Sequence, residues 1–193
     1  MTATATPFGL RPAKLLGDRP ATGGMRLMKI ASGYTANLFH GDLVKLVAGG
    51  TIEKDTGTTT ATPVGVFMGC QYTDPSLGYL LHKQYWPTGT VASDAYGFVV
   101  DDPDMLWEIQ ADETLGQNAI GMNAALVQTA GSTATGTSKV SLDGDSIAGT
   151  AALPLRIVDF KDADEIGTTY PLVLVKINEG DHQYRTAAGN AAS

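Results

Sequence analysis

The fold class is decided by the stretch Val64-Gly65-Val66-Phe67-Met68-Gly69-Cys70-Gln71-Tyr72. Its apolar side chains at the even positions recur with a period of two, which is typical of a β-strand with one buried face. Glycine at positions 65 and 69 leaves room on the other face for a close neighbour or a bend. We therefore predict a strand that buries Val64, Val66, Met68, Cys70 and Tyr72 on one face.

Similar short segments lie on both sides of this strand and are separated by turn residues. Before it, we expect strands at residues 43–47 and 51–53; after it, we expect strands at residues 79–86, 96–100, 105–110, 153–160 and 170–178. Residues 111–128 give no clear prediction. Residues 129–150 are rich in Gly, Ser, Thr and Ala, which favours a long surface loop. About eight to ten short strands without a long helix indicate a mainly β fold, either an antiparallel β-barrel or a β-sandwich.

The amino-acid composition agrees with a β-rich domain that has its own core. The 193 residues include 23 Gly and 9 Pro, and charged residues make up 17% of the chain, below the usual quarter. A polar surface of Thr, Ser, Asn and Gly suits strands, turns and surfaces that contact other proteins. A chain of this length buries enough surface to fold without disulfides or metals, and its single cysteine excludes an internal disulfide.

The N-terminal segment differs from the rest of the chain in charge and in pattern. Residues 1–30 contain five basic residues and one acidic residue, a net charge of +4, whereas the other eight basic and 19 acidic residues give −11. Frequent proline and glycine argue against a helix there. We predict an extended basic N-terminal arm over residues 1–29, a single β-rich domain over residues 30–185 and a flexible tail over residues 186–193. The alternative interpretation of residues 1–29 is a disordered terminus. If these residues form a separate arm, the β-rich domain should fold after they are deleted.

Side chains that could carry catalysis or hold a metal are few and scattered. Cys70 lies on the apolar face of a predicted strand, so we expect a small buried hydrophobe and not a nucleophile. His40, His82 and His182 form no pair with the spacing of metal ligands. The chain contains no phosphate-binding loop, dinucleotide fingerprint, zinc-protease motif or serine nucleophile elbow. We expect no catalytic residue, no cofactor and no metal site, and hence a protein that is not an enzyme.

Acidic residues gather in one segment that contains no Lys or Arg. They are Asp94, Asp101, Asp102, Asp104, Glu108, Asp112 and Glu113. Crowded carboxylates can share a proton or bind a hard cation such as calcium. The loop Asp101–Asp104, however, lacks the ligand order of an EF-hand. Three interpretations stay open for this segment: a solvated loop, an acidic docking surface and a cation site.

Several stretches together carry a resemblance to a known class of proteins. They are Pro7-Phe8-Gly9-Leu10-Arg11-Pro12, Ile30-Ala31-Ser32-Gly33-Tyr34, Phe39-His40-Gly41-Asp42-Leu43-Val44, Pro63-Val64-Gly65-Val66-Phe67-Met68-Gly69 and Trp86-Pro87-Thr88-Gly89. In these stretches the chain resembles virion structural proteins of tailed bacteriophages, especially small capsid decoration or cement proteins. The resemblance implies a structural protein that binds the outer surface of a phage capsid and stabilises contacts between neighbouring major capsid protein subunits. It also implies a homo-oligomer, with a trimer favoured over a dimer.

The predicted arm supplies the candidate contact residues for such a partner. Its basic and apolar side chains offer reach and electrostatic complementarity; the candidates are Phe8, Leu10, Arg11, Lys14, Arg19 and Arg26. An acidic remainder of the chain argues against nucleic acid as a partner. The N-terminus shows no secretory signal and no apolar run reaches membrane-spanning length, so we expect no membrane partner. We expect synthesis in the host bacterial cytoplasm and a final location on the capsid surface of the virion.

Two other functions stay open at this point. One is a head–tail joining or tail structural component, which the sequence hardly distinguishes from a decoration protein. The other is a carbohydrate-binding β-module. Such modules present exposed aromatic side chains to sugars, whereas Trp86 and Trp107, the two tryptophans of the chain, are both expected in the core.

Overall fold

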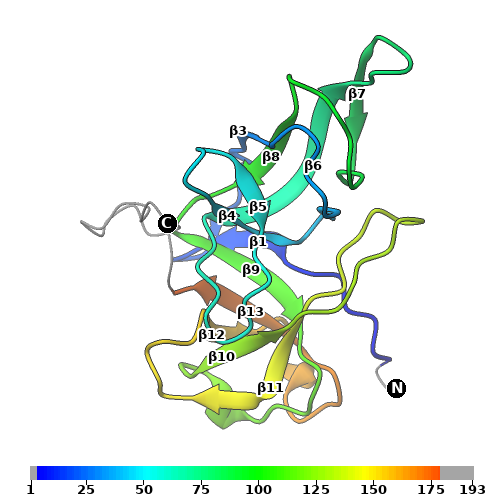
Figure 1. The fold of residues 1–193 in the computed structure, drawn as a ribbon. Helices are drawn as coiled ribbons and strands as arrows, with labels where there is room; N and C mark the ends of the chain where they lie inside the picture. The colour runs from blue at the N-terminus through cyan, green and yellow to red at the C-terminus, as the bar shows by residue number, and fades with distance from the viewer. Residues whose placement is uncertain (1–3, 179–193) are drawn as a thin grey trace.

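The computed structural model describes residues 4–178, which form two antiparallel sheets packed together (Figure 1). The predicted mainly β class is confirmed. Of the two architectures expected, the described residues form a β-sandwich and do not close into a barrel. Two short 3-10 helices, η1 (Gln117–Ala119) and η2 (Ala163–Glu165), interrupt the strands.

The first sheet has seven strands in the order β11-β10-β12-β13-β9-β1-β2. In chain order they are β1 (Arg11–Leu15), β2 (Arg19–Pro20), β9 (Met105–Gln110), β10 (Asn123–Val127), β11 (Ser141–Ala148), β12 (Leu155–Phe160) and β13 (Leu172–Ile177). The end strand β11 also returns towards the end of β9, where Ala111 and Leu142 form an isolated bridge. This sheet therefore curls strongly around its own core.

The second sheet has the order β3-β8-β6-β4-β5, with β7 paired to β6. Its strands are β3 (Arg26–Lys29), β4 (Leu43–Leu46), β5 (Ile52–Lys54), β6 (Gly65–Thr73), β7 (Leu80–Lys83) and β8 (Tyr96–Val100). The strands β8 and β9 have the bounds that the sequence predicts. Figure 1 shows β6 and β7 extending from this sheet as a hairpin at one end of the molecule.

The expectation of a long surface loop over residues 129–150 is wrong for its second half. Residues 141–148 form β11, and Val140 and Leu142 are buried in the core. Residues 123–127, which gave no clear prediction, form β10. Asp and Gly within β11 have low intrinsic strand preference, so pairing with β10 determines its conformation.

The prediction that Val64, Val66, Met68, Cys70 and Tyr72 share one face is also wrong. The pairing of β6 with β8 shifts register between Phe67 and Gly69, and Gly69 has a φ of 138°. This β-bulge changes the face to which the following side chains point. Val66 therefore packs into the core that the two sheets share, whereas Phe67 and Cys70 pack into a separate core of the second sheet.

The predicted arm over residues 1–29 is not a separate arm in its described part, residues 4–29. Strand β1 lies inside the first sheet, between β9 and β2, and β3 forms an edge of the second sheet. Leu10 is fully buried. The segment is extended as predicted, but it is held in place by contacts with the rest of its own chain. The predicted C-terminal tail, residues 186–193, lies outside the described residues.

Two stretches that carry the resemblance cross each other at the centre of the molecule. The Leu10 N–H donates to the Gly41 carbonyl at 3.0 Å, and the Gly9 N–H donates to the Val140 carbonyl at 3.1 Å. A Cβ at Gly9 would lie 2.4 Å from the Gly41 oxygen, and Gly9 has a φ of 77°. Only glycine fits such a close backbone crossing. Gly9 is therefore required by the fold at this position.

Candidate docking surfaces

The six predicted contact residues of the N-terminal segment mainly contact this chain itself. Leu10 belongs to the hydrophobic core. The Arg11 guanidinium lies 3.8 Å from the centre of the half-buried Phe8 ring. Arg26 pairs with Asp101 at 2.9 Å, Arg19 approaches Asp104 at 3.9 Å, and Lys14 pairs with Asp18.

The charge asymmetry of the sequence is thus partly neutralised within the molecule. Strand β1 lies antiparallel to β9, with Arg11 opposite Glu108. This arrangement brings the basic segment against the acidic segment 94–113 of the same chain. Glu108 itself pairs with Lys161 at 2.9 Å. Among the four basic candidates, only Arg11 forms no salt bridge within residues 4–178.

The acidic segment forms separate structural contacts and does not converge on a cation. Asp101 faces Arg26, the Asp94 carboxylate accepts two hydrogen bonds from Thr73, and Asp112 accepts one from the Gly144 N–H. Hydrogen bonds from Thr73 hold the pKa of Asp94 below its usual value. Within residues 4–178, no group of three His, Cys, Asp or Glu side chains could hold a metal ion.

The cysteine and the two histidines within residues 4–178 are buried or packed against other side chains. Cys70 is buried as predicted, and this burial raises the pKa of its thiol to about 12, so that the thiol stays protonated at neutral pH. Burial, together with the charge of Arg11, lowers the pKa of His40. His82 stacks on Phe98 with ring centres 6.1 Å apart, and His182 lies outside the described residues.

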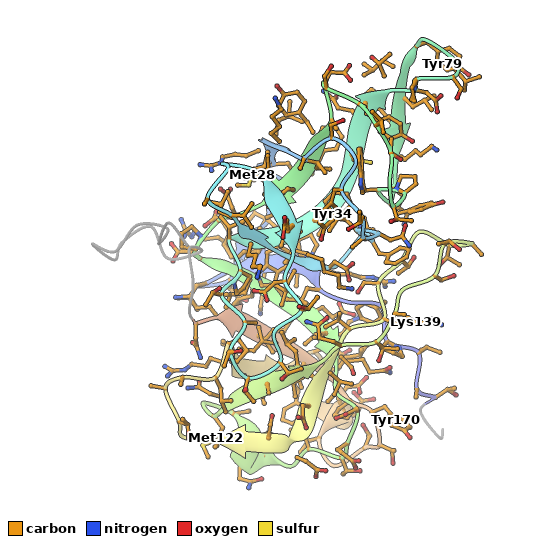
Figure 2. All side chains as sticks on the ribbon, viewed as in Figure 1. Met28, Tyr34, Tyr79, Met122, Lys139 and Tyr170 are labelled. Atoms are coloured by element: carbon orange, nitrogen blue, oxygen red, sulfur yellow. The ribbon has the colours of Figure 1, made fainter. Side chains whose placement is uncertain are left out.

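The end of the β6–β7 hairpin is an exposed apolar surface. Leu77, Tyr79 and Leu80 are 56%, 55% and 51% exposed. We call these three residues the hairpin-tip patch. Figure 2 shows Tyr79 at the far end of the projecting hairpin. Sequence reasoning missed this patch; the signal was a group of large apolar residues, Leu77, Tyr79 and Leu80, at and just before the start of the strand expected over residues 79–86.

Hydrogen bonds hold the hairpin tip in one shape. The Asp74 carboxylate accepts hydrogen bonds from the N–H groups of Ser76 and Leu77, at 2.8 and 3.1 Å. At the base of the turn, the Thr73 hydroxyl donates to Asp94 at 2.6 Å, which ties the hairpin to the loop that carries Val91. The apolar side chains are therefore presented by a braced turn, and little entropy is lost when they bind a partner.

A second surface feature is a groove where the two sheets meet. It has a volume of about 400 Å³. Its floor is made by Met68, Val100 and Met105, and its walls by Pro12 and Ala13 of β1 and by the connection from Ala21 to Met25. His40 also lines it. We call this feature the sheet-junction groove; most of its lining is apolar, as in typical binding pockets.

Comparisons with known proteins found no relative, because no protein-family model, curated protein or solved structure matches the chain.

Both tryptophans are fully buried, so neither offers a stacking surface to a sugar. Among residues 4–178 there is no helix of the length and apolarity needed to cross a membrane.

Proposed function

We propose that this chain is a structural protein of a bacteriophage particle that binds the outer surface of the capsid and stabilises contacts between neighbouring major capsid protein subunits. It acts by binding through preformed surfaces and not by catalysis. The sequence resemblance in residues 7–12 and 39–44 motivates this proposal. The observation that carries it is the hairpin-tip patch, because large apolar side chains on a braced projection suit contact with another protein.

The architecture supports a binding role in a large assembly. Two packed sheets form a stiff body, and the hairpin places its apolar side chains at one end of that body (Figure 2). Many copies around a shell act together, so that each single contact can be modest in affinity. The buried, protonated thiol of Cys70 and the structural contacts of the acidic segment agree with this role.

The copy number in purified particles tests the proposal. We expect the protein in near-stoichiometric ratio to the major capsid protein, measured by quantitative mass spectrometry of particles purified from the phage that encodes it. A handful of copies per particle would instead indicate a head–tail joining or tail component. Absence from particles would refute a virion role.

Adding purified protein to shells that lack it tests the location. We expect sedimentation with intact shells and saturation at a fixed ratio to the capsid protein, with the bound protein open to protease on the outside. Protein that fails to sediment with shells under any condition in which it is folded would contradict a place on the capsid surface.

A further inference from the structure

We infer that the hairpin-tip patch of one copy binds in the sheet-junction groove of a second copy of this chain. The inference goes beyond the proposed function, because it stands on the two surfaces and holds or fails without any virus particle. Its first support is that one molecule carries both a projecting apolar knob, Leu77, Tyr79 and Leu80, and an apolar groove of about 400 Å³. Pockets of roughly 300–1,000 Å³ accommodate a drug-sized ligand, and so have room for a few large side chains.

The geometry excludes filling of the groove by the hairpin of the same copy. Strand β6 passes through both features, since Met68 lies in the groove floor and Thr73 lies at the hairpin base. At about 3.3 Å per strand residue, these two positions are roughly 16 Å apart along a continuous strand. The hairpin continues away from the groove beyond Thr73, so only another molecule can bring its tip there.

The charges around the two surfaces are complementary. Asp74 lies in the turn that carries the tip patch, and within residues 4–178 its carboxylate has no salt-bridge partner. At the groove, Arg11 is exposed beside Pro12, and its guanidinium stacks on Phe8 without a salt bridge to another residue in the range 4–178. Opposite charges at the rim of an apolar contact steer association and fix its orientation.

A contact between two different surfaces of the same chain is heterologous. Such contacts close into a ring when the rotation between copies allows it and otherwise continue as an open chain. A closed ring gives every copy one filled groove and one buried tip. This arrangement provides a physical basis for the homo-oligomer that the sequence resemblance implies.

The mass of the purified full-length protein is the first measurement. By sedimentation velocity across a concentration series, we expect wild type above the 20.1 kDa of one chain. We expect Leu77→Ser/Tyr79→Ser, and separately Ala13→Glu in the groove wall, to sediment as monomers with unchanged circular dichroism. Ala21→Glu is a second groove variant in case Ala13→Glu fails to fold. Ile166→Ser, which removes an exposed apolar side chain elsewhere, is the matched control and should keep the wild-type mass.

Mixing the two defective variants distinguishes this contact from any other self-association. Each keeps one intact surface, so an equimolar mixture should form dimers and nothing larger, because the tip of the groove variant still fits the groove of the tip variant. A wild type that stays monomeric at all concentrations would overturn the inference, and so would a groove variant that keeps the wild-type mass. Neither result would alter the copy number of the protein in particles, so the proposed function is tested separately.

Discussion

At the scale of single residues, Asp42 joins three segments that are distant in the sequence. Its carboxylate is fully buried and accepts hydrogen bonds from the Phe39 N–H at 2.9 Å, the Ser138 hydroxyl at 2.6 Å and the Lys54 ammonium at 3.1 Å. The Lys54 side chain is only 14% exposed. A buried carboxylate is tolerated in the core because its charge is paired and its oxygens accept hydrogen bonds.

Removing the cation of this pair should destabilise the protein strongly. We expect Lys54→Met to lower the free energy of unfolding by about 3–5 kcal/mol, because a buried charge is left without its partner. Chemical denaturation followed by tryptophan fluorescence measures the change. The control is Lys161→Met, which breaks the more exposed pair with Glu108 and should cost less than about 1 kcal/mol. Equal effects of the two substitutions would show that Lys54 does not stabilise Asp42.

At the scale of secondary-structure elements, β1 explains why the N-terminal segment belongs to the body. It pairs with β9 across a register shift between Pro12 and Lys14. Proline cannot donate a ladder hydrogen bond, and a bulge is one of the few places in a sheet that tolerates it. Leu10, just before β1, fills the core that both sheets share.

Deletion of residues 1–20 should therefore abolish cooperative folding, in contrast to the expectation for a separate arm. The deletion uncovers the edge of β9 and removes Leu10 from the core. Leu10→Ala alone should cost about 2–5 kcal/mol of stability, as for other buried leucines, whereas Lys14→Ala at the surface should change it by less than about 0.5 kcal/mol. Thermal unfolding by circular dichroism measures all three. A truncated protein with a wild-type unfolding transition would contradict the integration of β1.

At the scale of the whole molecule, one hydrophobic cluster connects the two sheets. It contains Leu43, Val66 and Val100 of the second sheet together with Trp107 and Val175 of the first. The chain also crosses between the sheets more than once, from β2 to β3 and from β8 to β9. Neither sheet can lose its packing without exposing apolar surface of the other.

The two sheets should consequently unfold together. We expect a single calorimetric transition, with a van't Hoff enthalpy equal to the calorimetric enthalpy. Differential scanning calorimetry should be carried out on a protein concentration series, because self-association would make the midpoint depend on concentration. Two separate transitions would show that the sheets are independent cooperative units.

Much of the strand content could be predicted from local pattern. The segments 43–46, 96–100 and 105–110 have apolar or β-branched side chains between turn residues, and they are strands in the structure. The hairpin-tip patch and the sheet-junction groove could not be predicted in this way. A surface depends on which elements meet, and Met68, Met105 and Ala13 meet only after the two sheets have packed.

The sequence by itself determined the mainly β class, the places of most central strands, and the burial of Cys70 and both tryptophans, because hydrophobic periodicity and turn residues act over a few neighbouring positions. Only the tertiary structure decided that the basic N-terminal segment is a strand against β9, that a bulge at Gly69 divides β6 between two cores, and that an acidic segment neutralises basic residues of its own chain. These features depend on contacts between residues far apart in the chain. Local pattern does not record such contacts, since their free energy arises from burial and charge pairing once the chain is packed.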